Sequence, residues 1–348
     1  MAERKGIKEI AKLAGVSIGT VDRVLHNRGR VSEETKKRVK EIAARINYKP
    51  NIMAKTLVMN KIHKIAILIP EPSQDEYWQQ AFEGIENTVT KSGQQGIQIK
   101  CYFYFLDDKK TFEESAKEIL KNMPDGVIIT PNFLDEGLIF YNQCMSASIP
   151  VIMFDTTIPD TKPLSFIGTD SFRSGMVAAE LLNMISHENG IFAILHFDEE
   201  LVNSPHMLEK ERGFIHYLKN EFPGREYQVM VLNNEKHSYS NQIKELLDKN
   251  EISGIYVSTS KAYRIADYLV KEKLKPIHLV GYDLTVRNIE FLEKGYISFL
   301  INQNPRRQAE QSIQLFTEYF IFKRKVEPRV LFPIDIITKT SLQSNEEY

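Results

Sequence analysis

The spacing of apolar residues in the first 46 positions constrains the fold most, because it fits only short helices joined by tight turns. Ile7, Ile10, Ala11 and Ala14 follow the i, i+3, i+4, i+7 pattern of a helix with one buried face. Gly15 comes next, and glycine tolerates the left-handed backbone that ends many helices. These residues predict a first helix that stops in a tight turn.

A second short helix is predicted directly after this turn. Ser17 can cap it by accepting a hydrogen bond from a backbone N–H group. Val21, Val24 and Leu25 then face the interior, which leaves Arg23 on the outer surface of the helix.

A third helix is predicted after Ser32, which can cap an acidic first turn that suits the helix dipole. Its buried stripe consists of Val39, Ile42, Ala43 and Ile46. Three short helices around one apolar interior give the helix-turn-helix geometry that places a second helix in the major groove of DNA. A generic three-helix bundle is the alternative.

Charge is divided unevenly between this segment and the rest of the chain. Residues 1–62 hold 15 Lys and Arg against 6 Asp and Glu, so 30 basic and 40 acidic residues remain in the rest. The total charge of −1 therefore hides a basic N-terminal part and an acidic body. A polyanion such as double-stranded DNA is the expected partner of the basic part, because each Lys or Arg placed on a phosphate releases counterions.

The run IKEIAKLAGVSIGTVDRVLHNRGRVSEETKKRVKEIAARINYKPNIMAKTL resembles the DNA-binding headpiece of the lactose-repressor (LacI/GalR) family of transcription regulators. The matching segments occur in the same order: AKLAGVS, the TV and RVL of the second helix, the VS before the third helix, and NYKPN. The resemblance continues along essentially all 348 residues. It implies a small all-α helix-turn-helix domain over residues 1–48, followed by a two-lobed α/β core.

The resemblance also implies roles for individual headpiece residues. Base edges in the major groove are read from the positions of Ile18, Gly19 and Arg23. Backbone phosphates are contacted from the positions of Ser17, Thr20, Ser32, Thr35, Tyr48 and Asn51. Because Gly19 has no side chain, we expect discrimination at its base pair to be weak or to come from DNA shape.

Asp22 departs from the family pattern, which commonly has a small hydroxyl residue at this position. Phosphates repel its carboxylate, unless it accepts a hydrogen bond from cytosine N4 or orients Arg23. We favour the second role, because the two residues are neighbours on one short helix. The operator sequence therefore does not transfer from relatives.

Residues 49–63 are expected to form a hinge between the headpiece and the core. In the resembled family this segment folds into a helix on DNA and inserts a leucine into the minor groove. Leu57 matches this wedge and Ala54 lies about one turn before it. An ordinary interdomain linker is the alternative.

From Lys64 onward, apolar strands such as KIAILIP alternate with amphipathic helices such as TFEESAKEILKNM, which is typical of parallel α/β units. About 285 residues in two similar halves predict two lobes rather than one sheet. The resemblance implies a periplasmic-binding-protein-like core over 64–348. Its N-lobe is expected at about 64–165 and 296–321, and its C-lobe at about 166–295 and 322–348, with crossovers near Phe166, Tyr296 and Phe322.

Polar and aromatic side chains follow the predicted strands, whose carboxyl ends face the default ligand crevice of such sheets. Tyr77 and Trp78 offer flat faces that suit a sugar ring. Hydrogen-bonding groups for sugar hydroxyls come from Asn132, Asp155, Thr259, Asp283 and Gln303. Each of these alone is as readily a turn residue or a helix cap, so the prediction depends on their shared position at one rim.

Similarity to the sugar-binding members of the superfamily extends position by position to Tyr77, Trp78, Asp155, Asp283 and Gln303. Arg173 and Lys210 resemble family positions beside the cleft, and surface salt bridges are the alternative for both. Residues 199–210 are expected to form a long rim loop that contributes Ser204 or His206. Thr156 stands where ribose-type binders have an arginine, which argues against ribose.

Several classes of protein are disfavoured by what the sequence lacks. No apolar run reaches the roughly 18 residues of a membrane span, and MAERKGIKEI has no apolar signal core, so we expect a cytoplasmic protein without a membrane partner. Cys101 and Cys144 lack metal-ligand spacing, so no metal or cofactor is expected. No phosphate-binding loop or nucleophile elbow is present, which leaves a glycoside hydrolase using the cleft carboxylates as the enzyme alternative.

These features predict a non-enzymatic transcriptional regulator, a repressor of carbohydrate-utilisation genes. It is expected to bind a pseudo-palindromic operator as a homodimer and to respond to a small sugar or sugar derivative between the lobes. The sequence allows either sign of response, release of DNA by an inducer or tighter binding with a corepressor. A DNA-binding scaffold whose core binds a non-sugar ligand or a protein partner is the alternative.

Overall fold

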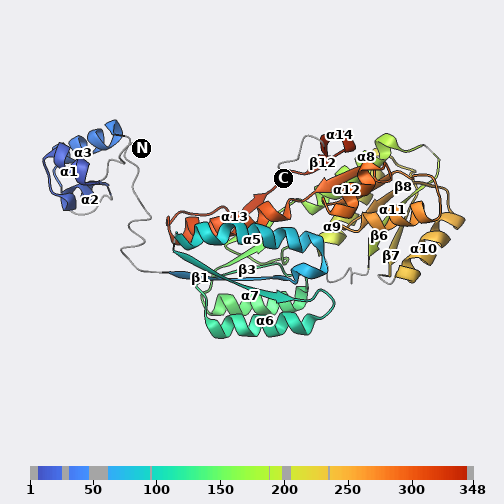
Figure 1. Ribbon diagram of the computed structural model, residues 1–348, viewed down its shortest axis with the longest axis horizontal. Coiled ribbons are helices and arrows are strands. Elements are labelled where there is room, and N and C mark those ends of the chain that lie inside the picture. The colour runs from blue at the N-terminus through green and yellow to red at the C-terminus, as the bar shows by residue number, and fades with distance from the viewer. Residues whose placement is uncertain are drawn as a thin grey trace. The chain divides into compact units, whose positions relative to one another are not determined.

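The computed structural model describes residues 7–25, 31–46, 62–94, 96–187, 189–197, 205–233 and 236–342. They form two compact units, one within residues 1–60 and the other within 61–348 (Figure 1). Most of the expected hinge, including Ala54 and Leu57, lies outside the described residues, as do Tyr48, Asn51 and Ser204.

The N-terminal unit contains the three predicted helices, α1 (Ile7–Ala14), α2 (Ile18–Leu25) and α3 (Glu33–Arg45). Their shared interior is fully apolar and includes Ile10, Ala14, Val21, Val24, Val39 and Ile42. Gly15 has a φ of 65°, so the turn between α1 and α2 uses the left-handed backbone expected of it. The cap of α3 is also confirmed, because the Ser32 hydroxyl accepts a hydrogen bond from the Thr35 N–H at 3.3 Å.

The first lobe of the core, here called the N-lobe, is built on a parallel sheet of strand order β11-β5-β4-β3-β1-β2. Its strands are β1 (His63–Pro70), β2 (Ile97–Tyr104), β3 (Gly126–Ile129), β4 (Val151–Phe154), β5 (Ser165–Gly168) and β11 (Arg329–Leu331). Helices α5 (Glu76–Gln94) and α13 (Pro305–Phe320) cover one face, and α6 (Lys109–Asn122) and α7 (Leu134–Ser146) cover the other (Figure 1). A short 3-10 turn, η1 (Pro72–Gln74), joins β1 to α5.

The second lobe, the C-lobe, repeats this design with the strand order β12-β10-β9-β8-β6-β7. Its strands are β6 (Ile191–Phe197), β7 (Tyr227–Leu232), β8 (Ile252–Val257), β9 (Leu279–Tyr282), β10 (Phe299–Asn302) and the antiparallel β12 (Asp335–Ile337). One face packs against α8 (Ser171–Ile185) and α9 (Pro205–Glu221). The other packs against α10 (Lys236–Lys249), α11 (Ala262–Lys271) and α12 (Val286–Glu293), and α14 (Lys339–Leu342) follows β12.

The two-lobed α/β core is confirmed, but the expected lobe boundaries need correction at three strands. β5 pairs with β4 in the N-lobe although its residues after 165 were assigned to the C-lobe, and β11 pairs with β5. β10 pairs with β9 in the C-lobe, although residues 296–321 were assigned to the N-lobe. The chain therefore crosses between the lobes after Gly168, after Asn302 and after Leu331. The predicted boundaries were wrong because an apolar pattern indicates a buried strand but not which sheet the strand joins.

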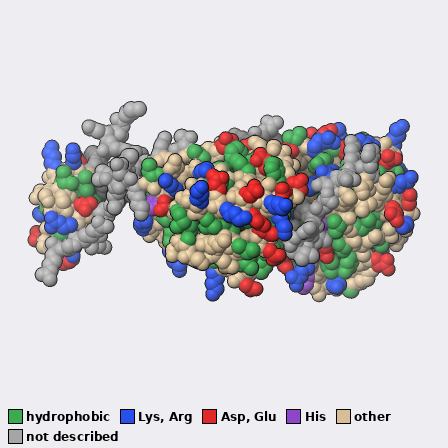
Figure 2. All heavy atoms as spheres, turned by 90° about the horizontal axis from the view of Figure 1, so that it is seen from below, with side chains coloured by type: hydrophobic (Ala, Val, Ile, Leu, Met, Phe, Trp, Pro, Cys, Tyr) green, Lys and Arg blue, Asp and Glu red, His purple; other side chains and the backbone are tan. Residues whose placement is uncertain are grey.

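The surface of the core carries charges of both signs. Over the described residues on the face that Figure 2 shows, acidic and basic side chains are interspersed rather than gathered into one patch. Among the helices of the described ranges, none has the length and apolar character that crossing a membrane requires.

Two glycines allow α8 and α9 to pack closely in the C-lobe. A Cβ atom on Gly175 of α8 would lie 1.9 Å from the Lys210 carbonyl oxygen of α9. A Cβ atom on Gly213 of α9 would lie 1.9 Å from the Phe172 carbonyl oxygen of α8. Since both neighbours are backbone atoms, a side chain at either position forces the helices apart.

We expect Gly175→Ala to lower the free energy of unfolding of the core by about 1–3 kcal/mol, because α8 must move away from α9. The matched control is Gly93→Ala in α5, where an added Cβ meets no atom within 4 Å. That change should leave stability unchanged or raise it by up to about 1 kcal/mol. Urea unfolding followed by fluorescence of Trp78, the single tryptophan, measures both, and equal midpoints would contradict the close packing.

Candidate functional site

The outer surface of α2 carries the three residues that the resemblance assigns to base reading. Ile18, Gly19 and Arg23 are all exposed, and they lie opposite the buried Val21 and Val24. The Arg23 guanidinium reaches back along the helix, because a Cβ atom on Gly19 would lie 3.9 Å from its Nη2 atom. A Cβ atom at position 19 would therefore be in ordinary contact with the arginine, which passes directly over this glycine.

Four hydroxyl residues gather at the N-termini of α2 and α3. The Ser17 and Thr20 hydroxyls lie 2.9 Å apart, and the Thr20 N–H donates to the Ser17 hydroxyl at 3.1 Å. Ser32 and Thr35 repeat the arrangement, with 2.8 Å between their hydroxyls. Helix N-termini carry partial positive charge and free N–H groups, so these positions suit contact with DNA phosphates.

A cavity of about 680 Å³ lies in the core, and side chains of both lobes line it. The predicted effector residues in its wall are Tyr77, Trp78, Asn132, Asp155, His206, Thr259, Asp283 and Gln303. Most of them come from strand ends or the segments after them, which is where parallel strands place their ligand groups.

Arg173, also predicted to be near the cleft, does not line the cavity. Its side chain is 78% exposed in the first turn of α8, where the guanidinium lies 4.0 Å from the Asp170 carboxylate. The alternative of a surface salt bridge is therefore correct for this residue. Asn132 does belong to the wall, where its side-chain oxygen accepts a hydrogen bond from the Tyr104 hydroxyl at 2.7 Å.

Asp155 and Asp283 occupy equivalent places in the two lobes. Asp155 follows β4 and Asp283 follows β9, and their φ angles of 67° and 66° put both in the left-handed region, which aspartate tolerates better than most residues. Asp155 accepts a short hydrogen bond from the Tyr77 hydroxyl. Asp283 accepts two from Gln303, one from its side-chain amide at 2.8 Å and one from its backbone N–H at 3.1 Å.

Burial raises the pKa values of both carboxyl groups. The pKa of Asp283 reaches about 7, against the opposing effects of the Lys210 charge and the Gln303 hydrogen bonds. The pKa of Asp155 is also raised by burial, against the hydrogen bond from Tyr77 and the Lys210 charge.

Lys210 is the cation that both aspartates share. It is 2% exposed, its ammonium donates to the Ser258 carbonyl oxygen at 3.2 Å, and it lies 3.8 Å from the centre of the Tyr282 ring. It comes from α9, which begins at Pro205, so residues 205–210 belong to a helix and not to the expected rim loop. His206 lies one turn earlier on this helix, and burial lowers its pKa to about 3, so the ring is neutral.

Buried polar side chains that sequence reasoning missed hold these groups in place. Gln308 of α13 accepts a hydrogen bond from the Asp155 N–H at 3.2 Å and donates to the Gln303 carbonyl at 2.7 Å, so it links the Asp155 turn to the residue that binds Asp283. The ring nitrogens of the fully buried His196 lie 2.7 Å from the Ser258 hydroxyl and 2.9 Å from the Glu211 carboxylate. The sequence gives no local signal for either role.

Further wall residues come from the loops after the strands and from the first turns of the helices that follow them, which the strand-end rule implies but the prediction left out. They are Gln74, Asp75, Leu106, Asp107, Lys109, Phe133, Asp135, Glu136, Ser258, Ser260, Lys261 and Arg264. Applying that rule to the loops after β1, β2, β3 and β8 would have found them.

The two cleft aromatics play different parts. Tyr77 and Trp78 are 6% and 5% exposed, and their rings meet edge to face with centroids 4.8 Å apart. Trp78 also packs edge to face against Phe154 at 6.3 Å. Tyr77 therefore contributes a hydroxyl that fixes Asp155, while Trp78 builds the apolar part of the wall.

We expect the ionisation of Asp283 to make stability fall as the pH rises from about 4 to about 7. In this range the folded protein keeps a proton that the unfolded chain has released, because an unfolded aspartate titrates near pH 4 and Asp283 near 7. The difference in unfolding free energy between the wild type and Asp283→Asn should therefore change across this interval and be constant above it. A constant difference from pH 4 to 8 would show that the pKa of Asp283 is the same in the folded and the unfolded protein.

Comparison with known proteins gives matches over both units. Residues 65–324 match a family described as periplasmic binding protein domain, and residues 6–51 match the bacterial regulatory proteins of the lacI family. The sucrose operon repressor of Lactococcus lactis subsp. lactis is 23% identical over 307 residues, covering 86% of this chain and 88% of that protein. The HTH-type transcriptional regulator DegA of Bacillus subtilis is 26% identical over 290 residues, covering 80% and 82%.

Solved structures agree with this picture. A structure described as a LacI transcriptional regulator from Bacteroides fragilis is similar with a TM-score of 0.76 and 28% identity, over 82% of this chain and all of that one. A glucose-galactose binding protein from Geobacillus stearothermophilus has a TM-score of 0.70 at 18% identity, over 81% and 99% of the two chains. The second likeness concerns the fold alone.

Proposed function

We propose a function on the premise that this chain belongs to the lacI family of bacterial regulatory proteins and carries a periplasmic binding protein domain. It is a DNA-binding transcriptional regulator, a repressor of carbohydrate-utilisation genes, and a small sugar-like molecule bound between the lobes controls its operator affinity. The observation that carries the sugar assignment is the pair of carboxyl groups, the half-buried Asp155 and the buried Asp283, that line one cavity.

On the DNA side, α2 enters the major groove with Ile18, Gly19 and Arg23 toward the bases. One headpiece makes too small an interface with DNA for strong specificity, so two copies of the chain bind a pseudo-palindromic operator as a homodimer. The hinge over residues 49–63 adds a minor-groove contact through Leu57. A regulator of this kind acts in the cytoplasm, where bacterial DNA lies.

On the effector side, the charges of the cavity favour a neutral polyhydroxylated ligand. The charge of the buried Lys210 acts on both Asp155 and Asp283, and each carboxylate keeps acceptor sites beyond its internal hydrogen bonds. Sugar hydroxyls can donate hydrogen bonds to these sites, whereas the two carboxylates would repel a ligand that is itself an anion. A neutral sugar is therefore preferred to a uronate or a sugar phosphate.

Two alternatives follow from the same site. A glycoside hydrolase would also place two carboxylates in a cleft, but the relatives named above are regulators and we propose a cleft that binds without catalysis. A corepressor instead of an inducer would reverse the sign of the response, and linkage allows either.

Isothermal calorimetry with sucrose, D-galactose and D-arabinose should detect binding of at least one neutral sugar and none of D-galacturonate or glucose 6-phosphate. Asp283→Ala should weaken that sugar at least tenfold, because hydrogen bonds to a charged group contribute about 1.5–3 kcal/mol. Arg173→Ala is the control outside the cavity and should leave the affinity unchanged. Tight binding of an acidic sugar would overturn the preference for a neutral ligand.

Arg23→Ala should cost about 1–3 kcal/mol of operator binding and relax the preference at one base pair in each half-site. Selection of bound sequences from a random DNA pool measures both effects. Arg38→Ala on α3 serves as the control, because that exposed arginine lies off the predicted reading surface and should leave the preference intact. An unchanged preference in the Arg23 variant would remove this residue from base reading.

A further inference from the structure

The start of α5 in the N-lobe reaches the C-lobe through three hydrogen bonds. A Glu76 carboxylate oxygen accepts from the Val286 N–H at 2.7 Å, and the Gln80 side chain donates to the Leu284 carbonyl at 3.0 Å. The Ser260 hydroxyl donates to the Asp75 carboxylate at 3.3 Å. Because Glu76 and Gln80 lie one helical turn apart, both face the same C-lobe segment.

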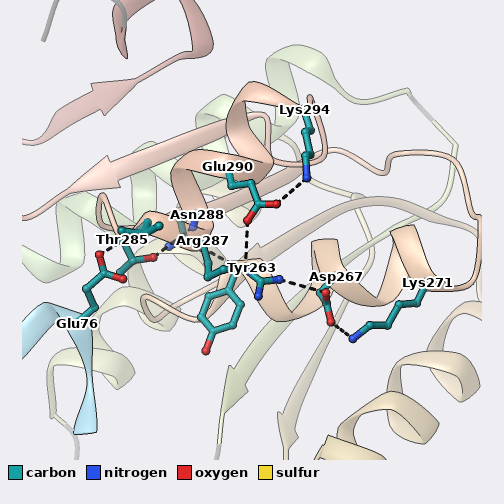
Figure 3. Close-up of polar contacts among 10 residues, drawn as sticks. Glu76, Tyr263, Asp267, Lys271, Thr285, Arg287, Asn288, Glu290 and Lys294 are labelled. Carbon is teal, nitrogen blue, oxygen red and sulfur yellow. Dashed lines mark hydrogen bonds and ion pairs between the residues drawn. The ribbon is translucent and has the colours of Figure 1, made fainter. Parts of the chain in front are cut away.

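The Glu76 contact satisfies a group that α12 itself leaves open. Val286 is the first residue of α12, and the N-terminal N–H groups of a helix have no partner within that helix. Thr285 caps the Asn288 N–H at 3.3 Å, so the Val286 N–H remains for another acceptor. A carboxylate at this end of a helix is also favoured by the helix dipole. Figure 3 shows Glu76 pointing from α5 toward this end of α12.

The start of α12 is tied to the effector site through Asn288. This fully buried side chain donates to the carbonyl oxygens of Ser260 and Tyr282 at 2.8 Å and of Asp283 at 3.1 Å. Its oxygen accepts from the Tyr263 N–H at 2.8 Å. The backbone of Asp283 and the N-terminus of α12 therefore keep a fixed relative position.

An ion pair joins α12 to α11 in the C-lobe, and two more lie along α12 itself (Figure 3). Arg287 of α12 lies 3.1 Å from the Asp267 carboxylate of α11 and 3.4 Å from that of Glu290. Glu290 in turn pairs with Lys294 at 2.6 Å. Of these pairs, Arg287–Asp267 joins α12 to α11, and the other two lie within α12 and its C-terminal cap; each is partly exposed and individually weak. A bond made to Val286 therefore acts on the lobe and not on a free loop.

We propose that Glu76 is a positioning residue for effector binding, which holds the C-lobe against the N-lobe by capping α12 across the cleft. The proposal rests on the proposed function of the cleft. Because the bond joins two lobes, it forms only in lobe arrangements that bring Glu76 to the Val286 N–H, as here, and its free energy favours them. A ligand that contacts both lobes then binds more tightly by linkage, although Glu76 need not touch it.

Amide hydrogen exchange tests the bond in the full chain without any ligand. In Glu76→Ala the Val286 amide should exchange at least threefold faster than in the wild type, while amides of α10 are unchanged. Glu76→Gln keeps an acceptor oxygen and should restore most of the protection. Glu86→Ala, an exposed residue of the same helix, is the matched control. Unchanged exchange at Val286 in Glu76→Ala would overturn the proposal.

A double-mutant cycle tests the consequence for binding. Val286→Pro removes the N–H donor at a position where helices accept proline, and the Thr285 ψ of 153° suits a residue before proline. The Val286 side chain is 69% exposed, so little packing is lost. The probe is whichever of sucrose, D-galactose and D-arabinose binds the wild type most tightly in calorimetry.

We expect Glu76→Ala and Val286→Pro each to weaken that sugar about threefold to tenfold, and the double variant to be no weaker than either single one. Strictly additive losses would overturn the proposal, because the two residues would then act independently. Failure of the wild type to bind any of the three sugars counts against the proposed function, whereas the exchange result at Val286 decides the bond between the lobes on its own.

Discussion

The burial of two carboxylates around one ammonium group is the constraint on which the rest of the core depends. Asp155 is half-buried and Asp283 is buried at the ends of equivalent strands, and the charge of the buried Lys210 acts on both. Buried charge is costly unless it is paired and hydrogen-bonded. Tyr77 and Gln303 donate those hydrogen bonds, while Gln308 accepts one from the backbone N–H of Asp155. The close packing of α8 on α9 at Gly175 fixes the position of Lys210.

Local sequence patterns predicted those parts of the structure that depend on residues close together in the chain. The headpiece helices, the left-handed turn at Gly15 and the cap at Ser32 follow from short-range spacing, so the sequence predicted them. The cavity residues at strand ends were also predictable, because parallel strands bring their carboxyl ends to one edge.

Other features depend on which elements meet, and the sequence does not state this. β5 and β10 have the apolar pattern of any buried strand, and this pattern does not identify the sheet that a strand joins. Their predicted assignment to a lobe was therefore wrong. Gln308, His196 and Asn288 look like ordinary polar helix or strand residues until the fold buries them against specific backbone groups. For Arg173 the prediction from the resembled family was wrong in the other direction. Its position matches a family residue beside the cleft, but its side chain does not line the cavity.

The central claim is that occupancy of the cleft changes the affinity for DNA, which by linkage requires the effector to bind one form of the protein more tightly than the other. The most direct measurement is the Kd of the full chain for an operator recovered by selection from genomic DNA, with and without a saturating neutral sugar that binds the core. We expect that Kd to change at least tenfold, with the direction identifying the sugar as inducer or corepressor. A sugar that binds the core and leaves the operator Kd unchanged would contradict the claim.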